Sequence, residues 1–461
     1  MLDPKIKEYL DQNKQKHLDS LFEMLRFPSI ANIKEPDGCL PCANWLRDYM
    51  LKIGMHAEVL PSSEDGTHQP CVFGELIVDP SAPTVLLYGH YDVQPADPLE
   101  LWKSPPFQPE IREDYMYGRG TSDDKGQLFM HLMAIEAYQA VGKLPVNVKC
   151  IFEGEEEIGS PTIEWFMQQN ADKLKADALI ISDTGFYADG VPSIVTALRG
   201  VFSCELYVTG PNRDVHSGME GGIITNPLNA LAKMVSGMHD QNGKITLPGF
   251  YDGVVEPAQD ELDAWQKLPF NQEEYAKELG VPTLAGGEKN YSPVERNWSR
   301  PTLDVNGLTG GYQGPGDKTV IASKASAKIT MRLVPGQEPE KIRQSMREYI
   351  QANTPEGVTA EIVFRSGNKA VLLDIDTPAM RAGKRAMEDA FGTEAYWVRA
   401  GASVPITETF QRVLGLNAVM LGVGLGTDNL HSPNERFKIE HFYKGAAMIA
   451  SALDEMQKEC K

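Results

Sequence analysis

The chain has 461 residues, more than one hydrophobic core normally holds, so at least two domains are expected. An apolar content of 42% and an aromatic content of 8% are typical of a globular protein. The net charge of −20 argues against nucleic acids and anionic membranes as partners, because both are polyanions. No apolar run approaches the roughly 18 residues that a membrane-spanning helix needs, so no membrane partner is expected.

The cysteines and the N-terminal residues bear on the cellular compartment. Six cysteines are sparse for this length, which favours a reducing environment. Cys39 and Cys42 form a C-x-x-C pair, but a structural zinc site needs a second pair and none follows, so we interpret both as structural. The segment 1–5 lacks the apolar core of a secretory signal. These features predict a cytoplasmic protein.

Strands and helices alternate through the first part of the chain. Apolar residues at helical spacing predict helices over 5–27, 41–53 and 161–174, and one that begins near Lys125. Apolar runs predict strands over 72–78, 84–88, 146–152 and 178–181. This order is typical of an α/β fold, with a mostly parallel, doubly wound sheet that helices cover on both faces.

The pattern changes near Gly200 and returns near residue 371. Between them, we expect strands over 201–208, 324–334 and 358–364, a helix that starts at Asn226-Pro227, and a charged helix over about 338–352. Residues 241–315, rich in glycine, proline and polar residues, predict a long excursion. We therefore expect an inserted α+β lid and dimerisation domain at 200–370, between catalytic parts at 1–199 and 371–461. The second catalytic part should contain a helix from Thr377-Pro378, a strand over 416–423 and a final helix near 440–458.

Polar side chains follow the predicted strands. His90 and Asp92 lie where strand 84–88 ends, and side chains two apart on an extended segment point the same way. Glu156, Glu157 and Asp183 follow two further strands, and functional groups of such sheets gather outside the carboxyl ends of the strands. Glycine-rich turns add Asp123 and His431.

Together these side chains offer the imidazoles and carboxylates that a pair of divalent cations needs. Each also has a structural alternative when it is taken alone. Asp123 could cap the helix that begins near Lys125, and the run 155–157 could be a solvated acidic turn. The convergence of several such residues at one edge of the sheet favours the metal site.

The motifs around these residues resemble those of the M20 family of metallopeptidases, and more narrowly its dipeptidase branch. The resemblance spans nearly the whole chain. The matching segments are 89–95, 117–126, 153–160, 181–183, 198–200, 214–222, 314–320 and 431–435.

The resemblance implies a role for each candidate residue. His90 and Asp183 match ligands of one metal ion, Glu157 and His431 match ligands of the other, and Asp123 matches the carboxylate that bridges both. A cis peptide bond is expected after Asp123. Asp92 matches the carboxylate that orients His90, and Glu156 matches the general base that takes a proton from a metal-activated water. The expected cofactors are two divalent metal ions, with zinc favoured and manganese or cobalt left open.

The resemblance also implies substrate contacts and a partner subunit. His216 resembles a lid histidine that reaches the partner's active site in family dimers. Arg332, Arg399 and Ser403 resemble groups that bind the terminal carboxylate of the substrate. The expected protein is thus a homodimeric metallodipeptidase that hydrolyses dipeptides or short peptides with a free C-terminus.

Two other functions fit part of the sequence. An M20 amidohydrolase that removes an N-acyl group from an amino acid shares the metal chemistry, but the long excursion 241–315 resembles the larger lid of the dipeptidase branch. A catalytically inactive metal-binding or scaffold protein conflicts with the intact set of ligands and the intact base.

Overall fold

In the computed structural model, the chain divides into two compact units. Residues 2–31, 38–142, 144–401 and 404–460 are described. Unit 1 contains residues 1–196, 373–398 and 409–461, and unit 2 contains residues 197–372 and 399–408. Among the described helices, none is both long and apolar enough to cross a membrane.

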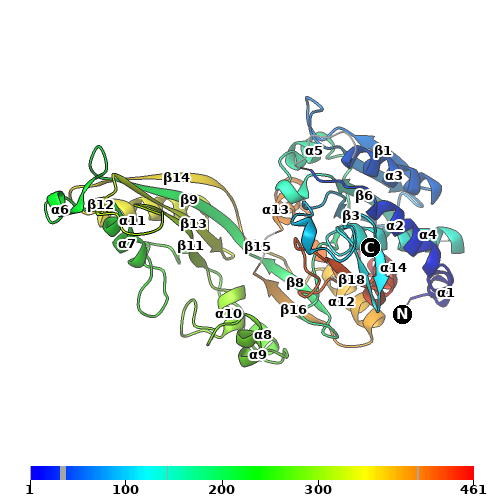
Figure 1. Ribbon diagram of the computed structural model, residues 1–461. Helices are drawn as coiled ribbons and strands as arrows, with labels where there is room; N and C mark the ends of the chain where they lie inside the picture. Colours follow the sequence, from blue (N-terminus) through cyan, green and yellow to red (C-terminus); the bar gives the residue numbers. More distant parts are fainter. Residues whose placement is uncertain (1, 32–37, 143, 402–403, 461) are drawn as a thin grey trace. The chain divides into compact units, whose positions relative to one another are not determined.

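Unit 1 is built on the parallel centre of a nine-stranded sheet (Figure 1). The four central strands, in spatial order, are β6 (Asn147–Glu153), β3 (Thr84–His90), β7 (Ala178–Ile181) and β17 (Ala418–Met420). On one side of this centre, β1 (His56–Leu60) and β2 (Cys71–Leu76) follow β6 in antiparallel orientation. On the other, β8 (Ser193–Leu198) lies antiparallel to β17; β15 (Val371–Leu372), whose residues belong to unit 2, is antiparallel to β8, and β16 (Tyr396–Ala400) also pairs with β8. The α/β class and the parallel centre of the sheet are as predicted.

The helices of unit 1 pack on this sheet and on one another. They are α1 (Pro4–Gln12), α2 (Lys14–Leu25), α3 (Cys39–Lys52), α4 (Lys125–Val141), α5 (Ile163–Gln169), α12 (Pro378–Phe391) and α14 (Ile439–Glu459), with 3₁₀ turns η1 (Leu99–Leu101) and η2 (Glu156–Ile158). Helix α13 (Pro405–Leu414) begins in unit 2 and ends in unit 1. Contacts join α3 to β1 and β2, α4 to β3, and α12 to α14.

Burial explains why the central strands are mostly apolar. Val85, Leu86, Leu87 and Tyr88 of β3 are all fully buried, as expected for a parallel strand covered on both faces. A small antiparallel sheet of β4 (Glu110–Arg112), β5 (Tyr115–Tyr117) and β18 (Arg436–Lys438) completes the unit. The pairing of β5 with β18 joins two segments that lie more than 300 residues apart.

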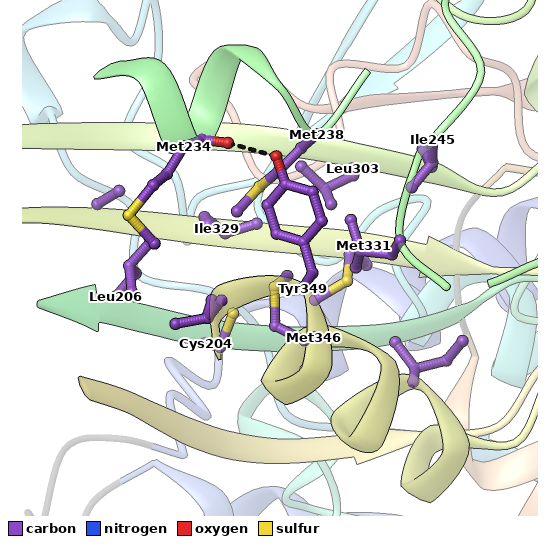
Figure 2. Close-up of a cluster of buried hydrophobic side chains, with 14 of the residues drawn as sticks. Cys204, Leu206, Met234, Met238, Ile245, Leu303, Ile329, Met331, Met346 and Tyr349 are labelled. Atoms are coloured by element: carbon purple, nitrogen blue, oxygen red, sulfur yellow. Dashed lines mark hydrogen bonds between the residues drawn. The ribbon is translucent and has the colours of Figure 1, made fainter. Parts of the chain in front are cut away.

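Unit 2 is an antiparallel sheet covered by helices. The sheet order is β11 (Thr302–Gly310), β13 (Lys324–Leu333), β9 (Gly200–Thr209) and β14 (Thr359–Asn368). Helices α7 (Pro227–Ser236) and α11 (Pro339–Asn353) pack against it. Figure 2 shows the apolar cluster between them, where the Tyr349 hydroxyl donates to the Met234 carbonyl over 2.8 Å.

The remaining elements of unit 2 are short. They are α6 (Ser217–Glu220), α8 (Gln259–Trp265), α9 (Gln272–Glu278), α10 (Pro293–Trp298) and the strand pair β10 (Val215–His216) and β12 (Val320–Ile321). The predicted excursion 241–315 therefore contains three helices and the edge strand β11, which the sequence analysis did not resolve.

Candidate metal centre

The candidate ligands gather at one edge of the central sheet in unit 1. His90 is the last residue of β3, Asp183 follows β7, and Glu157 lies in the turn η2 that follows β6. Because β6, β3 and β7 are parallel neighbours, their carboxyl ends meet at this edge. The sequence-predicted convergence is therefore present in the structure.

Asp123 lies between two imidazoles. Its Oδ1 is 3.1 Å from His90 Nε2, and its Oδ2 is 3.0 Å from His431 Nε2. The peptide bond between Asp123 and Asp124 is cis, as expected. Asp124 is fully buried, and its Oδ2 accepts a hydrogen bond from the His90 backbone over 3.1 Å. The Asp123 carboxylate thus has one oxygen near each of the two histidines.

Each histidine also faces a second carboxylate. His90 Nε2 is 3.9 Å from Asp183 Oδ2, and His431 Nε2 is 3.3 Å from Glu157 Oε2. Among the described residues, two groups of metal-ligating side chains therefore form, and they share Asp123: His90, Asp123 and Asp183 in one, Asp123, Glu157 and His431 in the other.

This donor set fits two divalent cations. Each group offers one imidazole nitrogen and two carboxylates, a combination that suits a borderline cation such as Zn²⁺. Glu157 is further held by Gln94, whose Nε2 donates to Glu157 Oε2 over 2.8 Å.

Charge pairing between these groups shifts their pKa values. Hydrogen bonds to Asp123 and Glu157 raise the pKa of His431 to about 10. Burial lowers the pKa of His90, but its hydrogen bonds to Asp123 and Asp92 outweigh that effect and raise it well above the usual value. Burial raises the pKa of Asp183 to about 7. Such strong perturbation within one cluster is typical of a functional site.

Asp92 has two contacts that place it behind the site. His90 Nδ1 lies 3.1 Å from the Asp92 backbone oxygen and 3.4 Å from its carboxylate. The carboxylate also accepts the backbone N–H groups of Glu156 and Glu157, over 3.1 and 3.0 Å. Asp92 is therefore placed where it could orient the histidine. It also binds the backbone of the turn that carries both glutamates, a contact that the sequence did not predict.

Glu156 lies beside the ligands in η2. Burial raises the pKa of its carboxyl well above the usual value, and the charges of Asp183 and Asp123 add to that increase. A half-buried carboxyl with a raised pKa, next to the candidate ligands, has the environment of a general base.

The other predicted site residues belong to unit 2, except that Ser403 lies outside the described residues. His216 ends β10, and its exposed side chain accepts a hydrogen bond from the Gly218 N–H over 2.9 Å. Arg332 lies on β13, opposite Thr302 of β11. The structure therefore gathers the metal-ligand candidates and Glu156 in unit 1 and leaves these side chains in the other unit.

Arg399 is 2% exposed and is already paired. Its Nε and Nη2 donate to Glu261 over 3.1 and 2.8 Å, and its guanidinium lies over Trp265. A substrate carboxylate could therefore use the two-nitrogen edge of this guanidinium only by displacing Glu261.

One residue that contacts the site loops was given no role by the sequence analysis. Glu435 is fully buried and accepts the backbone N–H groups of Ser122 and Asp123 over 3.0 and 3.1 Å. The only sequence feature that could have pointed to Glu435 is its position four residues after the candidate ligand His431.

Comparisons with known proteins agree with this geometry. Residues 86–455 match the family model that is described as "Peptidase family M20/M25/M40". The chain is 31% identical to the Cys-Gly metallodipeptidase dug1 of Schizosaccharomyces pombe, over 98% of both chains. It is 30% identical to the Beta-Ala-His dipeptidase of Homo sapiens, covering 88% of this chain and 81% of that protein.

A solved structure extends the likeness to three dimensions. The M20 family metallo-carboxypeptidase from Sulfolobus solfataricus is 34% identical and has a TM-score of 0.83, covering 96% of this chain and 99% of that one. The family match covers well over half of the chain, and the predicted resemblance is confirmed. The chain belongs to peptidase family M20/M25/M40.

Proposed function

We propose that this peptide hydrolase is a two-metal dipeptidase that acts on dipeptides or short peptides with a free C-terminus. The observation that carries the proposal is the position of Asp123 between two imidazoles, each with its own second carboxylate. The names of the relatives support it, since one is a Cys-Gly metallodipeptidase and another a Beta-Ala-His dipeptidase.

His90, Asp123 and Asp183 would hold one ion, and Asp123, Glu157 and His431 would hold the other. Zinc is the ion we propose, because mixed imidazole and carboxylate ligation suits it, while manganese and cobalt accept the same donors. Bound ions of this kind supply Lewis-acid polarisation of the peptide carbonyl and make water acidic near neutral pH.

Glu156 performs the proton transfers in this proposal. Its carboxylate accepts a proton from the attacking water and returns it to the leaving amine as the C–N bond breaks. Burial raises the pKa of Glu156, which makes its carboxylate a stronger base. Asp92 supports this step indirectly, because its carboxylate holds the Glu156 backbone in place over 3.1 Å.

We assign substrate contacts to unit 2 on the resemblance. His216 would donate a hydrogen bond to the developing oxyanion, and Arg332, Arg399 and Ser403 would bind the terminal carboxylate. Arg399 can do so through Nη1, a buried atom without a hydrogen-bond partner among the described residues, while Glu261 keeps the guanidinium in place. We further propose that unit 2 acts as a lid, that the protein forms a homodimer and that it is cytoplasmic.

A panel of substrates tests the proposal. The zinc-loaded enzyme would be assayed on Cys-Gly, β-Ala-His, their C-terminal amides and N-acetyl amino acids. We expect hydrolysis of the free dipeptides and a loss of about 10- to 100-fold on the amides, since a charge-assisted pair is worth about 1.5–3 kcal/mol. Activity on the N-acetyl amino acids alone would favour the amidohydrolase and contradict the proposal.

A further inference from the structure

Glu435 is a buried carboxylate to which the proposed chemistry assigns no role. Its Oε1 accepts the Ser122 and Asp123 N–H groups over 3.0 and 3.1 Å. Its Oε2 accepts the Gly120 N–H over 2.9 Å and Arg119 Nη1 over 2.7 Å. Both oxygens are therefore fully used, and every partner lies in the loop that ends at the bridging aspartate.

Arg119 extends these contacts to the segment that carries His90. Its side chain is 1% exposed, and its Nη2 donates to the Pro95 carbonyl over 3.1 Å. Since Nη1 binds Glu435, one buried ion pair joins the 89–95 segment to the loops of Asp123 and His431.

The loop that carries His431 is fastened on both sides of the histidine. On one side, Asp428 Oδ2 accepts the Ser122 hydroxyl over 3.0 Å. On the other, the Glu435 carbonyl accepts the Gly118 N–H over 3.0 Å, directly before β18 pairs with β5. His431 thus projects from a loop whose two ends bind the loop of Asp123.

We propose that Glu435 is a positioning residue that sets the distance between the bridging carboxylate and the His431 imidazole. The proposal rests on the two-metal function proposed above. A bridging carboxylate must place both oxygens within bonding distance of two cations, so displacements near 0.5 Å already reduce binding. The bonds to the Ser122 and Asp123 amides fix the backbone directly before the cis peptide.

A glutamine at this position cannot replace the glutamate. The amide nitrogen of the glutamine would take the place of one of the two carboxylate oxygens, each of which accepts two hydrogen bonds. Two hydrogen bonds would therefore be lost, and their two donors would be left unpaired. Shortening the side chain in Glu435→Asp keeps the charge but withdraws the carboxylate by one methylene, which predicts an intermediate effect.

The test measures metal binding as well as turnover. Wild type, E435Q and E435D would be stripped of metal and titrated with Co²⁺, with the visible absorption spectrum and affinity in chelator competition as readouts. Values of kcat and KM for one dipeptide would be measured on the same preparations. Glu288→Gln is the matched control, because Glu288 is 8% exposed and pairs with Arg300 over 2.8 Å in unit 2.

We expect E435Q to lose about 10- to 100-fold in Co²⁺ affinity and in kcat, with an altered spectrum and a KM within about twofold of wild type. E435D should lie between the two, and E288Q should bind Co²⁺ like wild type. Wild-type affinity and spectrum in E435Q would overturn the proposal.

Other outcomes separate this inference from the proposed function. If neither Glu435 variant folds, the residue belongs to the fold and not to the metal centre, which also overturns the inference. If wild type itself does not bind two Co²⁺ ions, the proposed two-metal function fails, and the inference fails with it.

Discussion

At the scale of single residues, the acidic side chains of the site have different surroundings. Asp123 and Glu157 face imidazoles directly, at 3.0–3.3 Å. Glu156 is adjacent in sequence but lies where burial raises its pKa. Two neighbouring glutamates therefore have different environments, which suits one as a ligand and the other as a base.

Replacement of Glu156 by glutamine tests this division. We expect Glu156→Gln to lower kcat for dipeptide hydrolysis by about 10²- to 10⁴-fold, because a positioned base contributes that much, while metal content stays unchanged. Steady-state kinetics and metal analysis provide the measurement. Glu164→Gln is the control: it removes a half-exposed carboxylate on α5 that pairs with Arg412 of α13, and it should retain wild-type kinetics. Unchanged hydrolysis in Glu156→Gln would refute its role as base.

At the scale of elements, turns and helix ends position the candidate ligands. The loop of His431 uses left-handed backbone at Asn429, His431 and Asn434, with φ of 57°, 57° and 63°. The first turn of α4 packs so closely on the loop of Asp123 that a Cβ at Gly126 would lie 1.9 Å from the Thr121 carbonyl oxygen. Glycine is required there by this approach of two backbones.

Gly126→Ala should therefore damage the metal centre even though alanine favours helix. The methyl group must displace the backbone of the 121–123 loop, so we expect weaker metal binding and at least about a tenfold loss of kcat. The comparison is Gly445→Ala on α14, where the added Cβ would meet the side chains of Met130 and Val423 and no backbone atom among its three nearest neighbours. That variant should lose about 1–3 kcal/mol of stability from overpacking and keep its kcat, and equal kinetics in the two variants would contradict the argument.

Local sequence patterns predicted the helices and strands well, but they did not predict the contacts between these elements. The runs that form β3, β6 and β7 are mostly apolar, and Asn226 and Thr377 cap α7 and α12 as expected. The antiparallel edges of the sheet and the strands β8, β11 and β16 were missed, because strand pairing depends on distant segments. For the same reason the bonds from Glu435 to the loop of Asp123, more than 300 residues away, were not predictable from spacing.

At the scale of the whole molecule, buried ionic clusters join elements far apart in sequence. Glu136 on α4 accepts hydrogen bonds from Tyr49 of α3 over 2.7 Å and from Tyr9 of α1 over 3.1 Å, and it pairs with Lys16 and His17 of α2. The Glu136 carboxylate thereby links the three N-terminal helices to α4, the helix that begins beside the candidate metal centre.

This cluster predicts a stability that depends on pH. Burial raises the pKa of Glu136, but the neighbouring His17 and the hydrogen bonds from Lys16 and Tyr49 outweigh it and hold the pKa well below the usual 4.5. The stabilisation is therefore complete above pH 4.5 and is lost as the pH falls below it. Glu136→Gln should lower stability by about 1–3 kcal/mol at neutral pH, with a difference from wild type that shrinks in acid.

Thermal unfolding across this pH range checks the prediction. The exposed Glu8 on α1 provides the control, since Glu8→Gln removes a carboxylate of the same helical region without breaking the cluster. A Glu136→Gln difference that stays constant with pH would contradict the role given to the ionised carboxylate.

The number of metal ions per chain tests the central claim most directly. Metal-free enzyme would be saturated with Zn²⁺ and its bound ions counted by native mass spectrometry, in wild type, His431→Ala and His90→Ala. Two groups of candidate ligands share Asp123, so wild type should hold two ions, and each variant should retain only one tightly bound ion. A wild-type enzyme that binds no more than one Zn²⁺ ion at saturation would contradict the two-metal site.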